Sequence, residues 1–148
     1  MKVWRLIAAG FGSGLAPKAP GTFGSFAGLV VGCLLLLGGH IALLIGLYVA
    51  TVLGLYAIRQ LPDATQDPGW IVIDEIAGQM LALLALSHFS LLGAALAFGL
   101  FRLFDIFKPG PVGWVDQRHD EYGVMGDDLV AGALAFIVLL LLRLVLPL

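Results

Sequence analysis

Charge is scarce in this sequence. Only 12% of its 148 residues are Asp, Glu, Lys or Arg, where a soluble domain carries about a quarter, and 60% are hydrophobic. Neither sign dominates, because the formal net charge is -2 and there is no basic stripe that would bind a nucleic-acid backbone. The sequence therefore predicts a membrane protein and argues against a nucleic-acid partner.

Cysteine is almost absent, and this excludes several chemistries. The single cysteine, Cys33, has no partner for an internal disulfide, and its apolar run VVGCLLLLGG disfavours a thiolate. We interpret it as a packing residue. No Cys and His set has zinc spacing, Cys33 has no Arg a few residues after it, and there is no D-x-D triplet. A structural zinc, a cysteine phosphatase and a covalent aspartate phosphatase of the D-x-D type are therefore not supported.

Long polar segments are lacking too, which predicts one domain over residues 1–148. Residues 19–58 and 76–101 contain no Asp, Glu, Lys or Arg, and each run is broken by a short polar turn, GGH or SHFS. Two helical hairpins and a last apolar segment follow. The expected helices are at about 24–37, 41–58, 71–86, 91–107 and 129–147.

The fold class is therefore all-α, a polytopic membrane bundle of about four to five short transmembrane helices. Several are shorter than the ~20 residues that a perpendicular span needs, so the first is a candidate re-entrant helix. The stretch MKVWRLIAAGFGSG has no full-length signal sequence, and we expect it to be retained as an interfacial helix or arm.

The charges that remain are gathered on one side of this bundle. Alternating helices place seven of the eight basic residues and all ten acidic residues on the same side. The opposite side has only the two polar turns and the end near Arg143. The positive-inside rule predicts that the charged side faces the cytoplasm.

Acidic pairs stand out on the charged side. Asp74 and Glu75 fall in the first turn of the third expected helix, Asp127 and Asp128 start the fifth, and Asp105 is near the end of the fourth. Each pair alone fits an ordinary acidic helix start, which the helix dipole favours. Together the carboxylates would repel one another unless a hard cation neutralised them. This pattern predicts Mg²⁺, which prefers oxygen ligands and commonly shares them with a substrate phosphate.

Two cations accompany the carboxylates. Arg102, Asp105 and Lys108 are spaced three apart, so neighbouring members share a helix face. They form either a surface salt-bridge ladder or, beside a metal site, a phosphate-binding pair of Arg102 and Lys108.

The segment GLAPKAPGTFGSFAG, residues 14–28, lies on the same side. Gly21 and Gly24 let backbone N–H groups approach an anion, and Thr22 and Ser25 add hydroxyls where the first helix begins. The same residue types also make ordinary helix caps. Asp67 is either a turn residue or part of the site, and the histidines have no supported catalytic role: His40, His88 and His119.

Four separated motifs, in the same order, are similar to those of the phosphatidylglycerophosphatase A family. They are GFGSGLAPKAPGTFGS, DPGWIVIDEIAGQ, FRLFDIFKPGPVGWVD and GVMGDDLVAG. The resemblance implies Mg²⁺-dependent removal of the terminal phosphate of phosphatidylglycerophosphate at the cytoplasmic leaflet of a bacterial inner membrane. The family's motifs match these positions: Asp74, Glu75, Arg102, Asp105, Lys108, Asp127 and Asp128.

The chain departs from the family pattern at RHDEYGVMGDD. Asp120, Glu121 and Tyr122 stand where the family usually has a glycine pair. Because this stretch leads into the aspartate pair, the departure bears on flexibility, substrate fit and metal affinity.

The mechanism expected from this resemblance assigns a role to each group. Four carboxylates hold one or two Mg²⁺ ions, which polarise the phosphoryl oxygens and activate a water for in-line attack: Asp74, Glu75, Asp127 and Asp128. Arg102 and Lys108 clamp the non-bridging oxygens, while Thr22 and Ser25 help position the group. Asp105 either orients Arg102 or acts as a base.

Three other classes stay open at this point. A small cation carrier or channel would use the carboxylates as an ion path, but it predicts ionisable groups across the whole membrane. A lipid-synthesising phosphotransferase would use the same paired aspartates, and it would yield a second lipid product. A purely structural membrane protein is the third. The sequence does not fix the oligomeric state.

Overall fold

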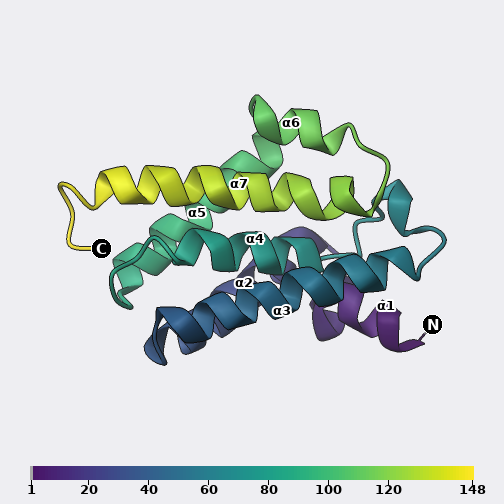
Figure 1. Ribbon diagram of the computed structural model, residues 1–148, viewed down its shortest axis with the longest axis horizontal. Helices are drawn as coiled ribbons and strands as arrows, with labels where there is room; N and C mark the ends of the chain where they lie inside the picture. Colours follow the sequence, from purple (N-terminus) through teal and green to yellow (C-terminus); the bar gives the residue numbers. More distant parts are fainter. Residues whose placement is uncertain (1) are drawn as a thin grey trace.

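The computed structural model describes residues 2–148, and every regular element in that range is a helix (Figure 1). The all-helical class predicted from the sequence is confirmed. In chain order the elements are α1 (Lys2–Ala8), η1 (Gly10–Leu15), α2 (Pro20–Leu37), α3 (His40–Arg59), η2 (Ala64–Gln66), α4 (Ile73–Leu83), α5 (Leu91–Phe107), α6 (Pro111–Asp116) and α7 (Glu121–Leu142).

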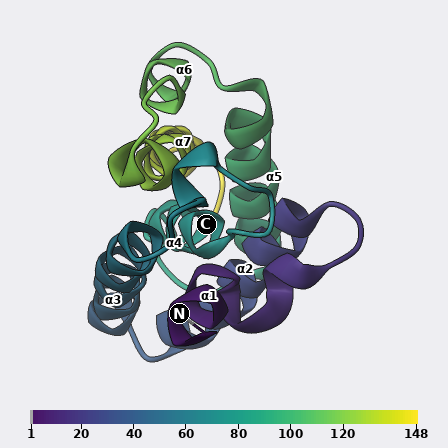
Figure 2. The same cartoon turned by 90° about the vertical axis from the view of Figure 1, so that its right-hand side faces the viewer.

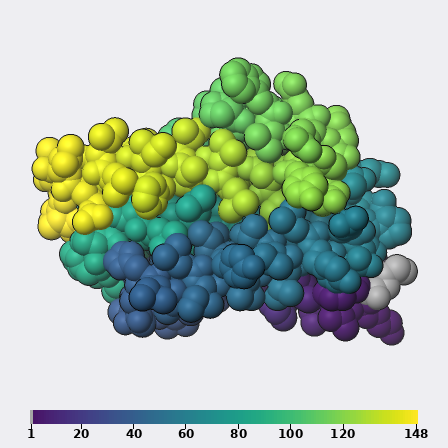
Figure 3. All heavy atoms as spheres, in the orientation of Figure 1, coloured from purple at the N-terminus to yellow at the C-terminus, as the bar shows by residue number. Residues whose placement is uncertain are grey.

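Helix α4 is the centre of the bundle. Viewed end-on, it lies inside a ring formed by α2, α3, α5 and α7 (Figure 2). The space-filling view shows side chains of α3 and α7 covering most of one face (Figure 3). Nine of the eleven residues of α4 are buried. At about 1.5 Å per residue this helix is roughly 16 Å long, too short to cross a hydrocarbon core of about 30 Å.

Glycines let α4 approach its neighbours closely. Gly24, Gly28 and Gly32 recur every fourth residue along α2, and all three are buried against α4. A Cβ at Gly28 would lie 2.8 Å from the Ile76 Cα, and a Cβ at Gly132 of α7 would lie 2.3 Å from the Gly78 carbonyl oxygen. Small residues at such crossings are typical of helices that pack in membranes.

Among residues 2–148, three helices are long and apolar enough to cross a membrane, namely α2, α3 and α7. They have 18, 20 and 22 residues, and α5 follows with 17. These lengths fit a membrane bundle, whereas the expected count of four to five spans stays a prediction. The shortest main helix is α4. The first helix expected from the sequence corresponds to α2, which is longer than predicted because it begins at Pro20 and has 18 residues.

The far end of α4 is closed by polar side chains from other helices. Arg143 Nη1 donates to the Ala85 carbonyl oxygen at 2.8 Å, and His40 Nε2 lies 2.7 Å from the Leu86 carbonyl oxygen. Backbone carbonyls at a helix end need such partners, most of all where water is scarce. Arg143 and His40, on the sparsely charged side, therefore have a structural role.

Helix α7 begins eight residues earlier than the predicted start at 129. The Asp120 side chain caps it by accepting a hydrogen bond from the Gly123 N–H at 2.7 Å. Asp127 and Asp128 are therefore inside α7, about 9 Å along its axis from the first residue, and the prediction that they start the helix is wrong. The departure from the family pattern is thus the cap and first turn of α7.

We expect Gly28→Val to destabilise the fold. The added side chain would push α2 away from the Ile76 backbone, and overpacking of this kind costs about 1–3 kcal/mol. Thermal unfolding of the purified protein in detergent would measure the change. Gly99→Ala is the matched control, because a Cβ at Gly99 meets nothing within 4 Å. A Gly28→Val protein that unfolds at the parent's temperature would contradict the close α2–α4 contact.

Candidate active site

Asp74 and Glu75 occupy the first turn of α4, as the sequence predicted. The Val72 N–H donates to the Ala8 carbonyl oxygen at 2.9 Å, which ties the start of α4 to α1. Asp74 is 4% exposed, and its Oδ1 accepts a hydrogen bond from the Glu75 N–H at 3.0 Å. The recessed start of α4 thus carries two adjacent carboxylates into the bundle.

A third carboxylate reaches this pair from α7. Asp74, Glu75 and Asp128 each offer an oxygen, and these oxygens lie within 4.8 Å of one another. Glu75 Oε2 and Asp128 Oδ1 are buried and find no hydrogen-bond partner among residues 2–148. We call these three residues the inner carboxylate group. Leaving buried carboxylate oxygens unpaired is costly, and oxygens of this kind are suited to bind a cation.

Arg102 borders the inner carboxylate group from α5. Its Nη1 donates to Ser25 Oγ at 3.3 Å and also forms an ion pair with Asp105. Gly21 provides the space, because a Cβ there would lie 2.6 Å from Glu75 Oε1 and 3.4 Å from Arg102 Nη1. A guanidinium has five N–H donors, so Arg102 keeps donors for an anion beside Glu75.

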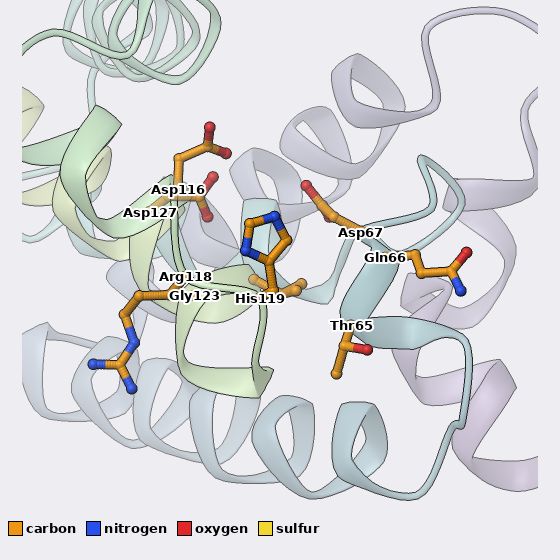
Figure 4. A pocket seen from close by; sticks show the side chains of 9 residues that line it. Thr65, Gln66, Asp67, Asp116, Arg118, His119, Gly123 and Asp127 are labelled. Atoms are coloured by element: carbon orange, nitrogen blue, oxygen red, sulfur yellow. The ribbon is translucent and has the colours of Figure 1, made fainter.

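A second set of carboxylates lines a neighbouring pocket of about 140 Å³. Oxygens of Asp67, Asp116 and Asp127 lie within 4.8 Å of one another, and we call them the outer carboxylate group. Lys108 Nζ donates to Asp127 Oδ2 at 2.7 Å and also pairs with Asp116. Figure 4 shows His119 lining the same pocket as the three aspartates.

The outer carboxylate group shifts the pKa values around it. Burial raises the pKa of Asp67, and the nearby positive charge of Lys108 only partly opposes that shift. Burial alone would lower the pKa of Lys108, but hydrogen bonds to Asp116 and Asp127 outweigh it and raise this pKa above its ordinary value. Lys108 therefore stays protonated at neutral pH and offsets part of the negative charge of the outer carboxylate group, through Asp116 and Asp127.

The two groups differ in their fit to a divalent metal ion. Both offer the oxygen ligands that Mg²⁺ prefers. The outer carboxylate group already holds the Lys108 ammonium, whereas the inner carboxylate group keeps two buried oxygens without a partner in the described part of the chain. The inner carboxylate group, Asp74, Glu75 and Asp128, thus fits a bound Mg²⁺ better.

The structure separates some residues that the sequence grouped together. Asp127 lies in the outer carboxylate group although its neighbour Asp128 lies in the inner one, because adjacent helix residues point about 100° apart. Lys108 follows the last residue of α5 in the left-handed conformation (φ 47°), and its side chain forms ion pairs with residues of α6 and α7. Of the predicted salt-bridge ladder on α5, only the pair of Arg102 and Asp105 is formed. Thr22 lines an apolar groove between α2 and α5.

Asp116 and His119 line the pocket of the outer carboxylate group, although neither was predicted as a site residue. Asp116 ends the short helix α6, which the sequence analysis did not predict. A usable signal existed, because Asp116 closes the motif FRLFDIFKPGPVGWVD that carries Arg102 and Asp105. His119 lies in the loop between α6 and α7, where sequence spacing gives no signal.

Comparisons with known proteins agree over most of the chain. A family model described as Phosphatidylglycerophosphatase A matches residues 6–143. A Haemophilus influenzae protein named "Phosphatidylglycerophosphatase A" is 39% identical over 137 residues, covering 90% of this chain and 84% of the relative. An Escherichia coli protein of the same name is 35% identical over 135 residues, covering 89% and 78%.

A third relative has a different name. The Bacteroides thetaiotaomicron protein named "Putative phosphatidylinositol-3-phosphatase" is 37% identical over 151 residues, covering 93% of this chain and 92% of its own. A comparison with the solved structures found no match.

Titration of Mg²⁺ into the purified protein is expected to raise its thermal unfolding midpoint. A ligand that binds only the folded state stabilises it by about 2.7 kcal/mol at a concentration of about 100 Kd. Asp128→Asn keeps the size of the side chain but removes its charge, so it should lose most of the rise. Asp63→Asn, at an exposed residue outside both groups, is the control. If Asp128→Asn keeps the parent's response, the inner carboxylate group does not hold the ion.

Proposed function

The chain belongs to the phosphatidylglycerophosphatase A family, and we propose that it hydrolyses the terminal phosphate of phosphatidylglycerophosphate with Mg²⁺. The products are phosphatidylglycerol and inorganic phosphate, so the reaction belongs to phospholipid biosynthesis. One observation carries the proposal. The inner carboxylate group has two unpartnered buried oxygens among the described residues, and Arg102 lies beside it.

Asp74, Glu75 and Asp128 hold the metal ion in this proposal. When bound, Mg²⁺ supplies Lewis-acid stabilisation of the phosphoryl charge and an activated water nucleophile. The three carboxylates come from α4 and α7, whose mutual contact fixes their spacing before substrate arrives. Such preorganisation is the main requirement of phosphoryl transfer.

Arg102 binds the phosphoryl oxygens. Ser25 and Asp105 occupy part of its guanidinium and fix its direction, which supports the orienting role for Asp105 over the role of a base. Lys108 and Asp127 form an ion pair in the outer carboxylate group. The existing ion pairs of Lys108 support a role in holding Asp116 and Asp127 rather than a direct clamp on phosphate.

The lipid part of the substrate lies along α2 and α5. The groove between these helices has a volume of about 280 Å³ and is lined by Thr22, Phe23, Phe26 and Phe98. Phe98 is one helical turn before Arg102 on α5, and Thr22 is three residues before Ser25 on α2, so the groove lies next to the phosphate-binding side chains on both helices. An acyl chain in the bilayer next to this groove places the phosphate at Arg102.

The membrane orientation follows from the distribution of charge. Both carboxylate groups lie toward the end of the bundle where α7 begins and α3 ends, which is also where most Lys and Arg residues are found. The positive-inside rule places this end in the bacterial cytoplasm. The site then faces the cytoplasmic leaflet, in an inner-membrane protein that crosses the bilayer several times.

A cation carrier is not favoured. A conducting path needs ionisable groups along the membrane, but the clustered carboxylates of residues 2–148 lie toward one end. At the opposite end, Arg143 and His40 contact the backbone carbonyls after α4. The family relationship also favours a phosphatase.

The function is tested by measuring phosphate release from phosphatidylglycerophosphate by the purified protein, with Mg²⁺ and with EDTA. We expect release with Mg²⁺ and its loss with EDTA. Phosphatidylinositol-3-phosphate should be tested in parallel, because one relative has the name of a phosphatase for that lipid. A preference for the inositol lipid would correct the substrate. Formation of a second lipid product without free phosphate would indicate a phosphotransferase.

Replacing Arg102 with Lys tests the phosphate-binding role. Lys keeps the positive charge but lacks the planar fork that contacts Ser25, Asp105 and an anion together. Loss of one donor that stabilises a transition state typically lowers kcat about 10²-fold or more, and we expect a fall of this size in Arg102→Lys. Arg59→Lys, at the end of α3, is the control. Unchanged kcat and KM in Arg102→Lys would remove Arg102 from the mechanism.

A further inference from the structure

Gln79 is a buried polar residue that the mechanism above does not use. It lies in the middle of α4 and is 0% exposed. Its Nε2 and Oε1 both lack a hydrogen-bond partner from any residue that the structure describes. A primary amide buried with neither atom paired is rare in folded proteins, and each such group calls for an explanation.

The position of Gln79 relates it to Glu75. The two residues are four apart on α4, so their side chains are neighbours on one helix face. Long side chains in a helix lean toward its N-terminus, which brings the Gln79 amide over the turn that carries Glu75. The close packing of α2 limits the other directions that the Gln79 side chain could take, because a Cβ at Gly28 would lie only 3.2 Å from the Gln79 Cβ.

The unpaired atoms of these two residues are complementary. Glu75 Oε2 is a buried acceptor without a donor in residues 2–148, and Gln79 Nε2 is a buried donor without an acceptor in the same range. A change in side-chain torsion angles is enough to join a donor and an acceptor that are one helical turn apart.

We propose that Gln79 is a positioning residue of the active site. Its amide N–H donates to the second oxygen of Glu75 when the inner carboxylate group holds its metal ion, and this hydrogen bond fixes the direction of the Glu75 carboxylate. The amide oxygen then accepts a hydrogen bond from a water of the same site. Hydrogen bonds of this kind to metal-binding carboxylates commonly change metal affinity or activity by about 10–100-fold.

A purely structural role for Gln79 predicts that its replacement destabilises the fold. The unpartnered amide does not stabilise the core in this way, so an apolar side chain of similar length should leave the fold equally stable or more stable. If the amide serves Glu75, it is therefore dispensable for folding and important for metal binding. This inference rests on the proposed function, but its test needs no turnover.

The experiment compares the parent, Gln79→Met and the control Gln60→Met by thermal unfolding over a range of Mg²⁺ concentrations. Gln60 is exposed at the end of α3. Without metal, Gln79→Met should unfold at the parent's temperature or above it. Its Mg²⁺-dependent rise should need about 10–100-fold more Mg²⁺ than the parent's, whereas Gln60→Met should match the parent throughout.

A double-mutant comparison shows whether Gln79 acts through Glu75. Glu75→Gln and Gln79→Met are combined, and the Mg²⁺ concentration at half-maximal rise is measured for each single variant and for the pair. If the two residues act as a unit, the second substitution adds little to the first. Additive shifts would overturn the proposal, and so would a Gln79→Met protein with the parent's Mg²⁺ response.

A second variant covers the case in which Gln79→Met does not fold. Gln79→Asn keeps a neutral amide but shortens the side chain by one carbon, so its N–H no longer reaches Glu75 and its Mg²⁺ response should also be weaker than the parent's. An unchanged response would overturn the proposal. A parent that shows no response to Mg²⁺ would overturn both this inference and the metal-dependent function, whereas a parent that binds Mg²⁺ without releasing phosphate would contradict the function alone.

Discussion

The close packing of α4 between α2 and α7 is the constraint on which the site depends. At Gly28 and Gly132 the neighbouring backbones approach too closely for any side chain. The same contacts set the distance between Asp74 on α4 and Asp128 on α7, and between Glu75 and Arg102 across Gly21. Packing and chemistry are therefore fixed by one arrangement, because a helix that moved away from its neighbours would also separate the charged groups.

The two carboxylate groups differ in how their negative charge is compensated. Lys108 offsets part of the charge of the outer carboxylate group from within the protein, with a hydrogen bond to Asp127 and an ion pair with Asp116. The inner carboxylate group has Arg102 nearby, but that residue is directed to Ser25 and Asp105. A buried group of carboxylates must be compensated by a cation or by protonation. This difference supports the proposal that the metal ion binds at the inner carboxylate group and that Lys108 holds Asp116 and Asp127 in place.

Much of the fold was readable from the sequence, because charge-free runs broken by GGH and SHFS define the hairpins. The start of α7 was not, since its first two turns contain charged residues that hide the helix, and the Asp120 cap is recognised only once the chain is folded. The structure places both acidic pairs in carboxylate groups, but Asp127 and Asp128 belong to different groups. Such a division depends on the rotation of α7 and on the left-handed turn at Lys108, which spacing alone does not reveal.

The proposed mechanism depends on a metal ion at the inner carboxylate group, at the start of α4. A crystal structure of the protein grown with Mn²⁺ in place of Mg²⁺, with anomalous scattering measured at the manganese edge, locates the ion directly. We expect an anomalous peak among Asp74, Glu75 and Asp128, with Lys108 still bound to Asp116 and Asp127. A peak only at the outer carboxylate group, or no peak at either group in well-ordered crystals, would contradict it.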